Sequence, residues 1–143
     1  MDFHLFSKKY RKVIERQLRV ITKANSVRAE REATEVSFMI KKILAELPSR
    51  GKKLRSLLFL YLINLYGGKI KSEHLTVACA LELVHNYFLI HDDVIDNDNW
   101  RGGVPSVLGW LRNNYHAAPT HKIGDKGVAQ AIVMGDIVSS IAF

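Results

Sequence analysis

The sequence is poor in features that would stabilise a small secreted protein or carry it across a membrane. Its single cysteine, Cys79, cannot form an internal disulfide, which favours a reducing, cytoplasmic compartment. The longest nearly apolar run, residues 57–66, is too short to span a bilayer, and the N-terminus has no signal-type apolar core. The net charge of +7 suits nucleic acid, anionic membranes or phosphorylated small molecules, and alone it does not choose among them.

Proline is scarce as well, so the chain contains long stretches without a helix breaker. The residues are Pro48, Pro105 and Pro119. Apolar residues recur at helical spacing, and Asn25 or Ser26 is expected to cap the second helix. The predicted helices cover residues 3 to about 23, 26–47, 52–66, 73–95, 107–114 and 128–143. Residues 97–105 are expected to form a loop, no β-hairpin signal or repeat is found, and the predicted fold class is all-α.

The third and fourth long helices, 52–66 and 73–95, are apolar on nearly every face. Such helices are stable only when neighbours cover them. More helices are therefore expected than this sequence supplies, and its last helix is still apolar at Phe143. Residues 1–143 are interpreted as one undivided part of a larger helical domain.

Three aspartates cluster at the C-terminal end of helix 73–95. Asp92 and Asp96 are four residues apart and share one helix face, with Asp93 beside them. Their mutual repulsion and the helix dipole are both unfavourable there, and a divalent cation would relieve both. Carboxylate oxygens favour Mg²⁺, which commonly bridges to substrate phosphates. A solvated acidic helix end without a ligand is the alternative.

Basic residues occur before and after this cluster. Lys52 and Arg55 are three residues apart at a predicted helix start, where backbone N–H groups and the helix dipole favour an anion. His85 lies two turns before Asp92, and Arg101 follows the carboxylates. An ordinary basic surface and a core histidine are the alternatives.

Together these segments resemble the trans-isoprenyl diphosphate synthases. Gly51–Arg55 resembles the Gly-Lys-Arg-x-Arg element of that family, and residues 82–85 with 91–96 resemble its first aspartate-rich region. Residues 101–106 are similar to the family's Arg-Arg-Gly-x-Pro-Thr segment, and residues 135–136 to its Ala-Gly-Asp segment. Three positions depart from the pattern: Arg50 replaces a glycine, Ser56 a proline and Gly102 an arginine.

The resemblance implies the N-terminal half of an isoprenoid-synthase-type helical bundle. Its implied reaction joins isopentenyl diphosphate to a dimethylallyl, geranyl or farnesyl diphosphate, with Mg²⁺ assisting ionisation. The implied Mg²⁺ ligands are Asp92, Asp93 and Asp96. The residues implied to hold diphosphate are Lys52, Arg55 and His85 for isopentenyl diphosphate and Arg101 for the allylic substrate.

Two aromatic residues, Tyr87 and Phe88, precede the first aspartate by five and four positions. In related enzymes, bulky residues there limit the length of the prenyl tail. The resemblance thus implies a floor formed by Tyr87 and Phe88 and a short product, farnesyl or geranylgeranyl diphosphate. Ordinary core aromatics are the alternative.

Only one aspartate cluster is present, whereas the family mechanism uses two. The resemblance therefore implies a C-terminal half on another chain, with no nucleic acid partner, and the alternative is that the sequence is a fragment. Two other functions stay open: a non-catalytic, diphosphate-binding regulatory subunit, and a metal phosphohydrolase. The phosphohydrolase would use His74, His91, Asp92 and Asp136.

Overall fold

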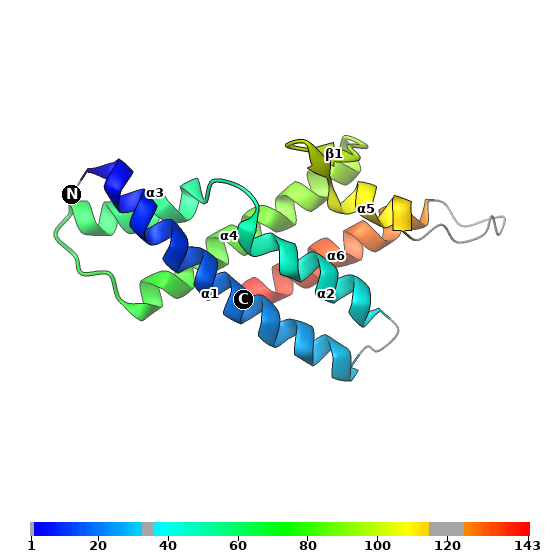
Figure 1. Ribbon diagram of the computed structural model, residues 1–143, viewed down its shortest axis with the longest axis horizontal. Coiled ribbons are helices and arrows are strands. Elements are labelled where there is room, and N and C mark those ends of the chain that lie inside the picture. Colours follow the sequence, from blue (N-terminus) through cyan, green and yellow to red (C-terminus); the bar gives the residue numbers. More distant parts are fainter. Residues whose placement is uncertain (1, 33–35, 115–124) are drawn as a thin grey trace. The chain divides into compact units, whose positions relative to one another are not determined.

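The computed structural model describes residues 2–32, 36–114 and 125–143 (Figure 1). These residues form six α-helices, which confirms the predicted all-α class. The helices are α1 (Phe3–Glu32), α2 (Ser37–Glu46), α3 (Leu54–Leu65), α4 (Ser72–Ile95), α5 (Val107–Asn114) and α6 (Lys126–Ala142). A 3₁₀ turn, η1 (Leu47–Ser49), follows α2, and the short strands β1 (Trp100–Arg101) and β2 (Val104–Pro105) follow α4.

The chain divides into two compact units. The first contains Met1–Leu83 and Ile141–Phe143, and the second contains Val84–Ser140. The basic segment Gly51–Arg55 lies in the first unit. The aspartate cluster lies in the second, together with His85 and Arg101.

The predicted break near Asn25 and Ser26 is wrong, because α1 continues without interruption to Glu32. Asn25 Nδ2 donates a hydrogen bond to the carbonyl of Ile21 at 3.0 Å, and Ser26 Oγ donates to the carbonyl of Thr22 at 2.8 Å. Both side chains thus bond back to the preceding turn instead of capping a new helix.

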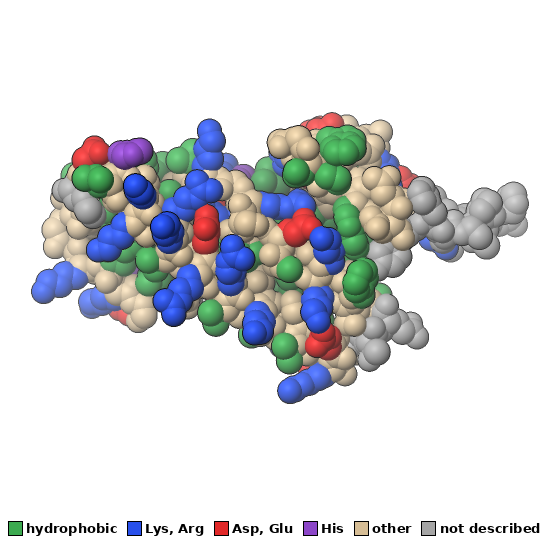
Figure 2. Space-filling model, in the orientation of Figure 1, with side chains coloured by type: hydrophobic (Ala, Val, Ile, Leu, Met, Phe, Trp, Pro, Cys, Tyr) green, Lys and Arg blue, Asp and Glu red, His purple; other side chains and the backbone are tan. Residues whose placement is uncertain are grey.

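The core of the first unit is built from the inner faces of four helices. Its buried apolar residues come from α1, from α2 with η1, from α3 and from the first part of α4, and include Phe6, Ile14, Leu18, Leu44, Leu47, Leu57, Leu60 and Ala78. The Tyr61 ring of α3 meets Phe6 of α1 edge to face, with centroids 5.2 Å apart. The outer face of α1 is basic, and Figure 2 shows lysine and arginine side chains along it.

The second unit contains a β-hairpin that the sequence interpretation missed. β1 and β2 are antiparallel, with Trp100 opposite Pro105 and Arg101 opposite Val104. The two residues between them, Gly102 and Gly103, have positive φ angles of 61° and 81°. A Gly-Gly pair suits a two-residue hairpin turn because glycine adopts positive φ without steric cost.

No helix among the described residues combines the length and the apolar character that a membrane span requires.

Cys79 gives a prediction for the first unit. The residue is fully buried, and burial, followed by the charge of Glu82, raises the pKa of its thiol to about 11. At about pH 8 only about one thiol in a thousand is then ionised, so Ellman's reagent should react slowly with the native chain. We expect reaction to be at least about a hundredfold faster in concentrated urea. Equal rates in a chain shown to be folded by circular dichroism would contradict this packing.

Candidate functional site

The carboxylates at the end of α4 fall into two environments. Asp92 and Asp96 are exposed, whereas Asp93 is only 3% exposed. The Asp96 N–H donates to the carbonyl of Asp92 at 2.8 Å, so the helical turn extends through Asp96 and keeps these two residues one turn apart. The backbone thus keeps Asp92 and Asp96 at the one-turn spacing expected of a helix, while the Asp93 side chain faces the interior.

Asp93 is paired with Arg101 of β1. Its Oδ1 accepts a hydrogen bond from Arg101 Nε at 2.8 Å and forms an ion pair with Nη2 at 2.6 Å. The hydrogen bond to Asp93 is the main reason that the pKa of the Arg101 guanidinium is raised. Arg101, expected to contact the allylic diphosphate, therefore also neutralises the buried carboxylate. Its side chain is still 40% exposed, which leaves part of it accessible to a ligand.

The hairpin that carries Arg101 is anchored on α5. Ser106 Oγ donates to the carbonyl of Asp98 at 2.8 Å, and the Ser106 N–H donates to the carbonyl of Asn99 at 3.0 Å. A Cβ on Gly109 would lie 2.1 Å from that Asn99 oxygen, so only glycine permits this approach. The role of Gly109 could not be predicted from the sequence, since a lone glycine in a helix carries no distinctive signal.

The helix α6 contacts α4 beside the carboxylates. A Cβ on Gly135 would lie 2.4 Å from His91 Cε1, so Gly135 gives room to the imidazole. His91 Nε2 is 3.6 Å from Asp136 Oδ1, and His91 Nδ1 is 3.1 Å from the carbonyl of Tyr87. The Gly135–Asp136 pair, singled out in the sequence, thus contacts α4 at His91, the residue that precedes Asp92.

The aromatic pair proposed as a chain-length floor lies on α4 in this unit. The rings of Tyr87 and Phe88 have centroids 5.0 Å apart, and Tyr87 is 4.5 Å from the His91 ring. Phe88 is 55% exposed, so its ring projects from the helix into accessible space. His85 is half-buried on the same helix.

The basic segment Gly51–Arg55 is also divided by burial. Lys52 and Arg55 are exposed, whereas Lys53, between them, is 2% exposed. The sequence placed Lys52 at the helix start, but α3 begins at Leu54 and Lys53 is its N-cap, with a left-handed φ of 57°. A turn, and not helical spacing, therefore brings Lys52 and Arg55 to the outside.

Across residues 2–32, 36–114 and 125–143, no group of three or more His, Cys, Asp or Glu side chains is gathered as a ligand set. Asp92 and Asp96 fit a hard cation that completes its shell with water and phosphate oxygens, while Asp93 is committed to Arg101. His74 Nδ1 accepts the Lys71 N–H at 3.1 Å, a capping role that gives no support to a phosphohydrolase.

The split among the aspartates predicts different stabilities for their variants. Asp93→Ala should lower the free energy of unfolding by about 2 kcal/mol, because it leaves Arg101 without its buried partner. Asp92→Ala and Asp96→Ala should change it by less than about 0.5 kcal/mol, since both side chains are exposed. Urea unfolding of the three variants without Mg²⁺ checks this. Equal losses in all three would show that Asp93 has no special structural role.

Sequence comparison relates the chain to a known protein family. A sequence model of the family described as "Polyprenyl synthetase" matches residues 37–143. The chain is 35% identical to a farnesyl diphosphate synthase of Bacillus subtilis over 129 residues, which cover 88% of this chain and 35% of that protein. It is 37% identical to a geranylgeranyl diphosphate synthase of Methanosarcina mazei over 94 residues, 65% of this chain and 24% of that protein.

The chain thus spans about a third or less of these curated relatives. No solved structure gives a significant match. The family match covers more than half of the chain and includes both the basic segment and the aspartate cluster. The chain therefore belongs to the polyprenyl synthetase family.

Proposed function

We propose that this chain provides the N-terminal, diphosphate-binding part of an enzyme that condenses isopentenyl diphosphate with an allylic diphosphate. The observation that carries the proposal is the exposed pair Asp92 and Asp96, one turn apart at the end of α4, within the segment that matches the family. The relatives named as farnesyl and geranylgeranyl diphosphate synthases support the same substrate class.

The metal part of the site rests on Asp92 and Asp96. Their carboxylates would bind Mg²⁺, which when bound supplies positive charge that stabilises the departing diphosphate. Arg101 would hold Asp93 with two nitrogens while its exposed part contacts the allylic diphosphate. Asp93 thereby keeps the arginine in place, a role different from the metal ligation implied by the sequence pattern.

The second substrate would be held by Lys52 and Arg55 of the first unit, and the family pattern implies the same role for His85. Lysine supplies a point charge and arginine a planar fork, which together suit a diphosphate. In the reaction the allylic carbon–oxygen bond breaks and a carbon–carbon bond forms to isopentenyl diphosphate. A proton then leaves the adduct, so no side chain needs to act as a nucleophile.

The rest of the synthase fold is proposed to come from a second polypeptide. Three leucines on one face of α3, Leu54, Leu58 and Leu62, are each about half exposed at 50%, 50% and 49%. Leucines spaced by four residues form a continuous apolar stripe, which a C-terminal helical partner would cover. A net charge of +7 favours a partner with an acidic balance.

Substitution of the aspartates tests the metal site. The chain should bind geranyl diphosphate only with Mg²⁺, and Asp92→Ala or Asp96→Ala should weaken binding by at least about tenfold, because each removes one metal ligand. Titration calorimetry measures the affinity, and Asp98→Ala, an exposed aspartate outside the pair, is the control. Unchanged Mg²⁺-dependent binding in both variants would contradict the assignment.

Condensation of isopentenyl diphosphate with geranyl diphosphate then tests catalysis. Activity is expected when the chain is mixed with the C-terminal part of a relative such as the Bacillus subtilis enzyme. Turnover by the isolated chain would contradict the need for a partner. Diphosphate binding without activity in any mixture would favour a regulatory subunit.

Product length tests the aromatic floor. If the prenyl tail runs along α4 from the metal-bound diphosphate, Phe88→Ala should lengthen the product by one or more isoprene units, because the exposed ring no longer blocks the tail. Tyr87→Ala should have a similar effect through the neighbouring ring. Chromatography of the products from the active assembly measures the change. An unaltered product distribution in both variants would place the floor elsewhere.

A further inference from the structure

Lys53 differs from the two basic residues that flank it. The proposed function gives Lys52 and Arg55 to isopentenyl diphosphate and leaves Lys53 without a role. The Lys53 side chain is fully buried, so its ammonium cannot reach a ligand in solvent. A buried lysine is unfavourable unless its charge and donors are satisfied. The contacts of the Lys53 ammonium therefore indicate the role of this residue.

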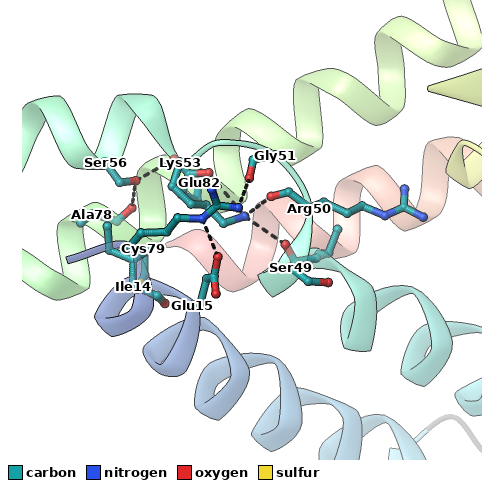
Figure 3. Close-up of polar contacts among 12 residues, drawn as sticks. Ile14, Glu15, Ser49, Arg50, Gly51, Lys53, Ser56, Ala78, Cys79 and Glu82 are labelled. Atoms are coloured by element: carbon teal, nitrogen blue, oxygen red, sulfur yellow. Dashed lines mark hydrogen bonds and ion pairs between the residues drawn. The ribbon is translucent and has the colours of Figure 1, made fainter. Parts of the chain in front are cut away.

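The partners of Lys53 join a loop to a helix. Nζ donates hydrogen bonds to the carbonyl of Leu47 at 3.2 Å and to the carbonyl of Arg50, and lies 3.8 Å from Glu82 Oε2 of α4 (Figure 3). Two backbone carbonyls thus accept hydrogen bonds from the ammonium, and the Glu82 carboxylate lies at ion-pair distance from it. The side chain thus connects η1 and the following loop to α4.

Glu82 is itself buried and held in place. It is 3% exposed, and its Oε1 accepts a hydrogen bond from Ser56 Oγ of α3 at 2.8 Å. The same hydroxyl is 2.5 Å from the carbonyl of Ala78. Burial lowers the pKa of Lys53, and the Glu82 carboxylate opposes that change. The contacts form one connected polar network among buried apolar residues of the first unit.

The network holds an unfavourable backbone turn. Lys53 has a φ of 57°, a left-handed conformation that is costly for a residue with a Cβ and persists only where the surroundings impose it. The Lys53 carbonyl accepts the Leu57 N–H at 2.9 Å and so begins α3. The turn therefore sets the direction of the residues on both sides of Lys53.

We propose that Lys53 is a positioning residue whose buried contacts hold the turn that directs Lys52 and Arg55 to the outside. The inference rests on the proposed function, because it assigns the affinity for isopentenyl diphosphate to this turn. Lys53 itself does not touch the substrate. Loss of its contacts releases the turn and displaces the two ligating side chains.

Titration calorimetry on the full chain tests the proposal. Lys53→Met should weaken binding of isopentenyl diphosphate by about ten- to a hundredfold, the effect of losing a hydrogen bond to a charged group. The affinity for geranyl diphosphate with Mg²⁺ should not change. Lys69→Met, which removes an exposed lysine from the same unit, should leave both affinities as in the wild type.

Two further variants separate positioning from general stability. Lys53→Arg retains a cation, and the related Gly-Lys-Arg-x-Arg element has arginine at this position. This variant should therefore bind isopentenyl diphosphate with the affinity of the wild type. In a Lys52→Ala/Arg55→Ala background, Lys53→Met should cause no further loss, because the residues through which it acts are gone. If Lys53→Met does not fold, Glu82→Gln replaces it as the test. Glu82→Gln removes the carboxylate charge opposite Lys53 with little change of shape, and it should weaken binding of isopentenyl diphosphate in the same way.

The outcomes separate this inference from the proposed function. Wild-type affinity in Lys53→Met, alongside weaker binding in Lys52→Ala/Arg55→Ala, would overturn the inference alone. Equal weakening of both substrates would also overturn it, since that is the effect of general destabilisation. Wild-type affinity in Lys52→Ala/Arg55→Ala, or no binding by the wild-type chain, would overturn the proposed diphosphate site together with the role of Lys53.

Discussion

The structure depends on the requirement that a charge removed from water must be paired. Lys53 in the first unit and Asp93 in the second are both buried, and each meets an opposite charge, Glu82 and Arg101 respectively. Each buried residue stands inside a short motif of like charges. The flanking charges that stay exposed are Lys52 and Arg55 in one motif and Asp92 and Asp96 in the other. Pairing thus separates a structural charge from the charges available to ligands.

Much of the fold could be predicted from the sequence because helical periodicity is a strong signal. The helices near 73–95 and 107–114 agree with α4 and α5. The errors arise where the same residue type has two uses. Asn25 and Ser26 are good caps, yet here they bond to the preceding turn of a continuous helix. The hairpin was not predicted because its sequence signal, the Gly102–Gly103 pair, is short and lies within a segment interpreted as a loop.

The candidate site could be predicted by motif but not by environment. Asp92 and Asp93 are chemically identical neighbours, and only the contact of Asp93 with Arg101 distinguishes them. Lys52 and Lys53 pose the same difficulty, since burial of Lys53 depends on Glu82, which is far away in the sequence, and on a left-handed turn. Periodicity reports which residues share a helix face, but it contains no information about partners on other segments.

The departures from the family pattern are explained by the same local physics. Gly102, which replaces an arginine, has a φ of 61°, a conformation in which a larger side chain would be strained. Ser56, which replaces a proline, donates to Glu82 and so joins the network around Lys53. Arg50, which replaces a glycine, has an extended backbone that any residue adopts, and its carbonyl accepts from Lys53. These three substitutions therefore fall in the framework around the exposed charges, while the exposed charges themselves, Lys52, Arg55, Asp92 and Asp96, keep the residue types of the family pattern.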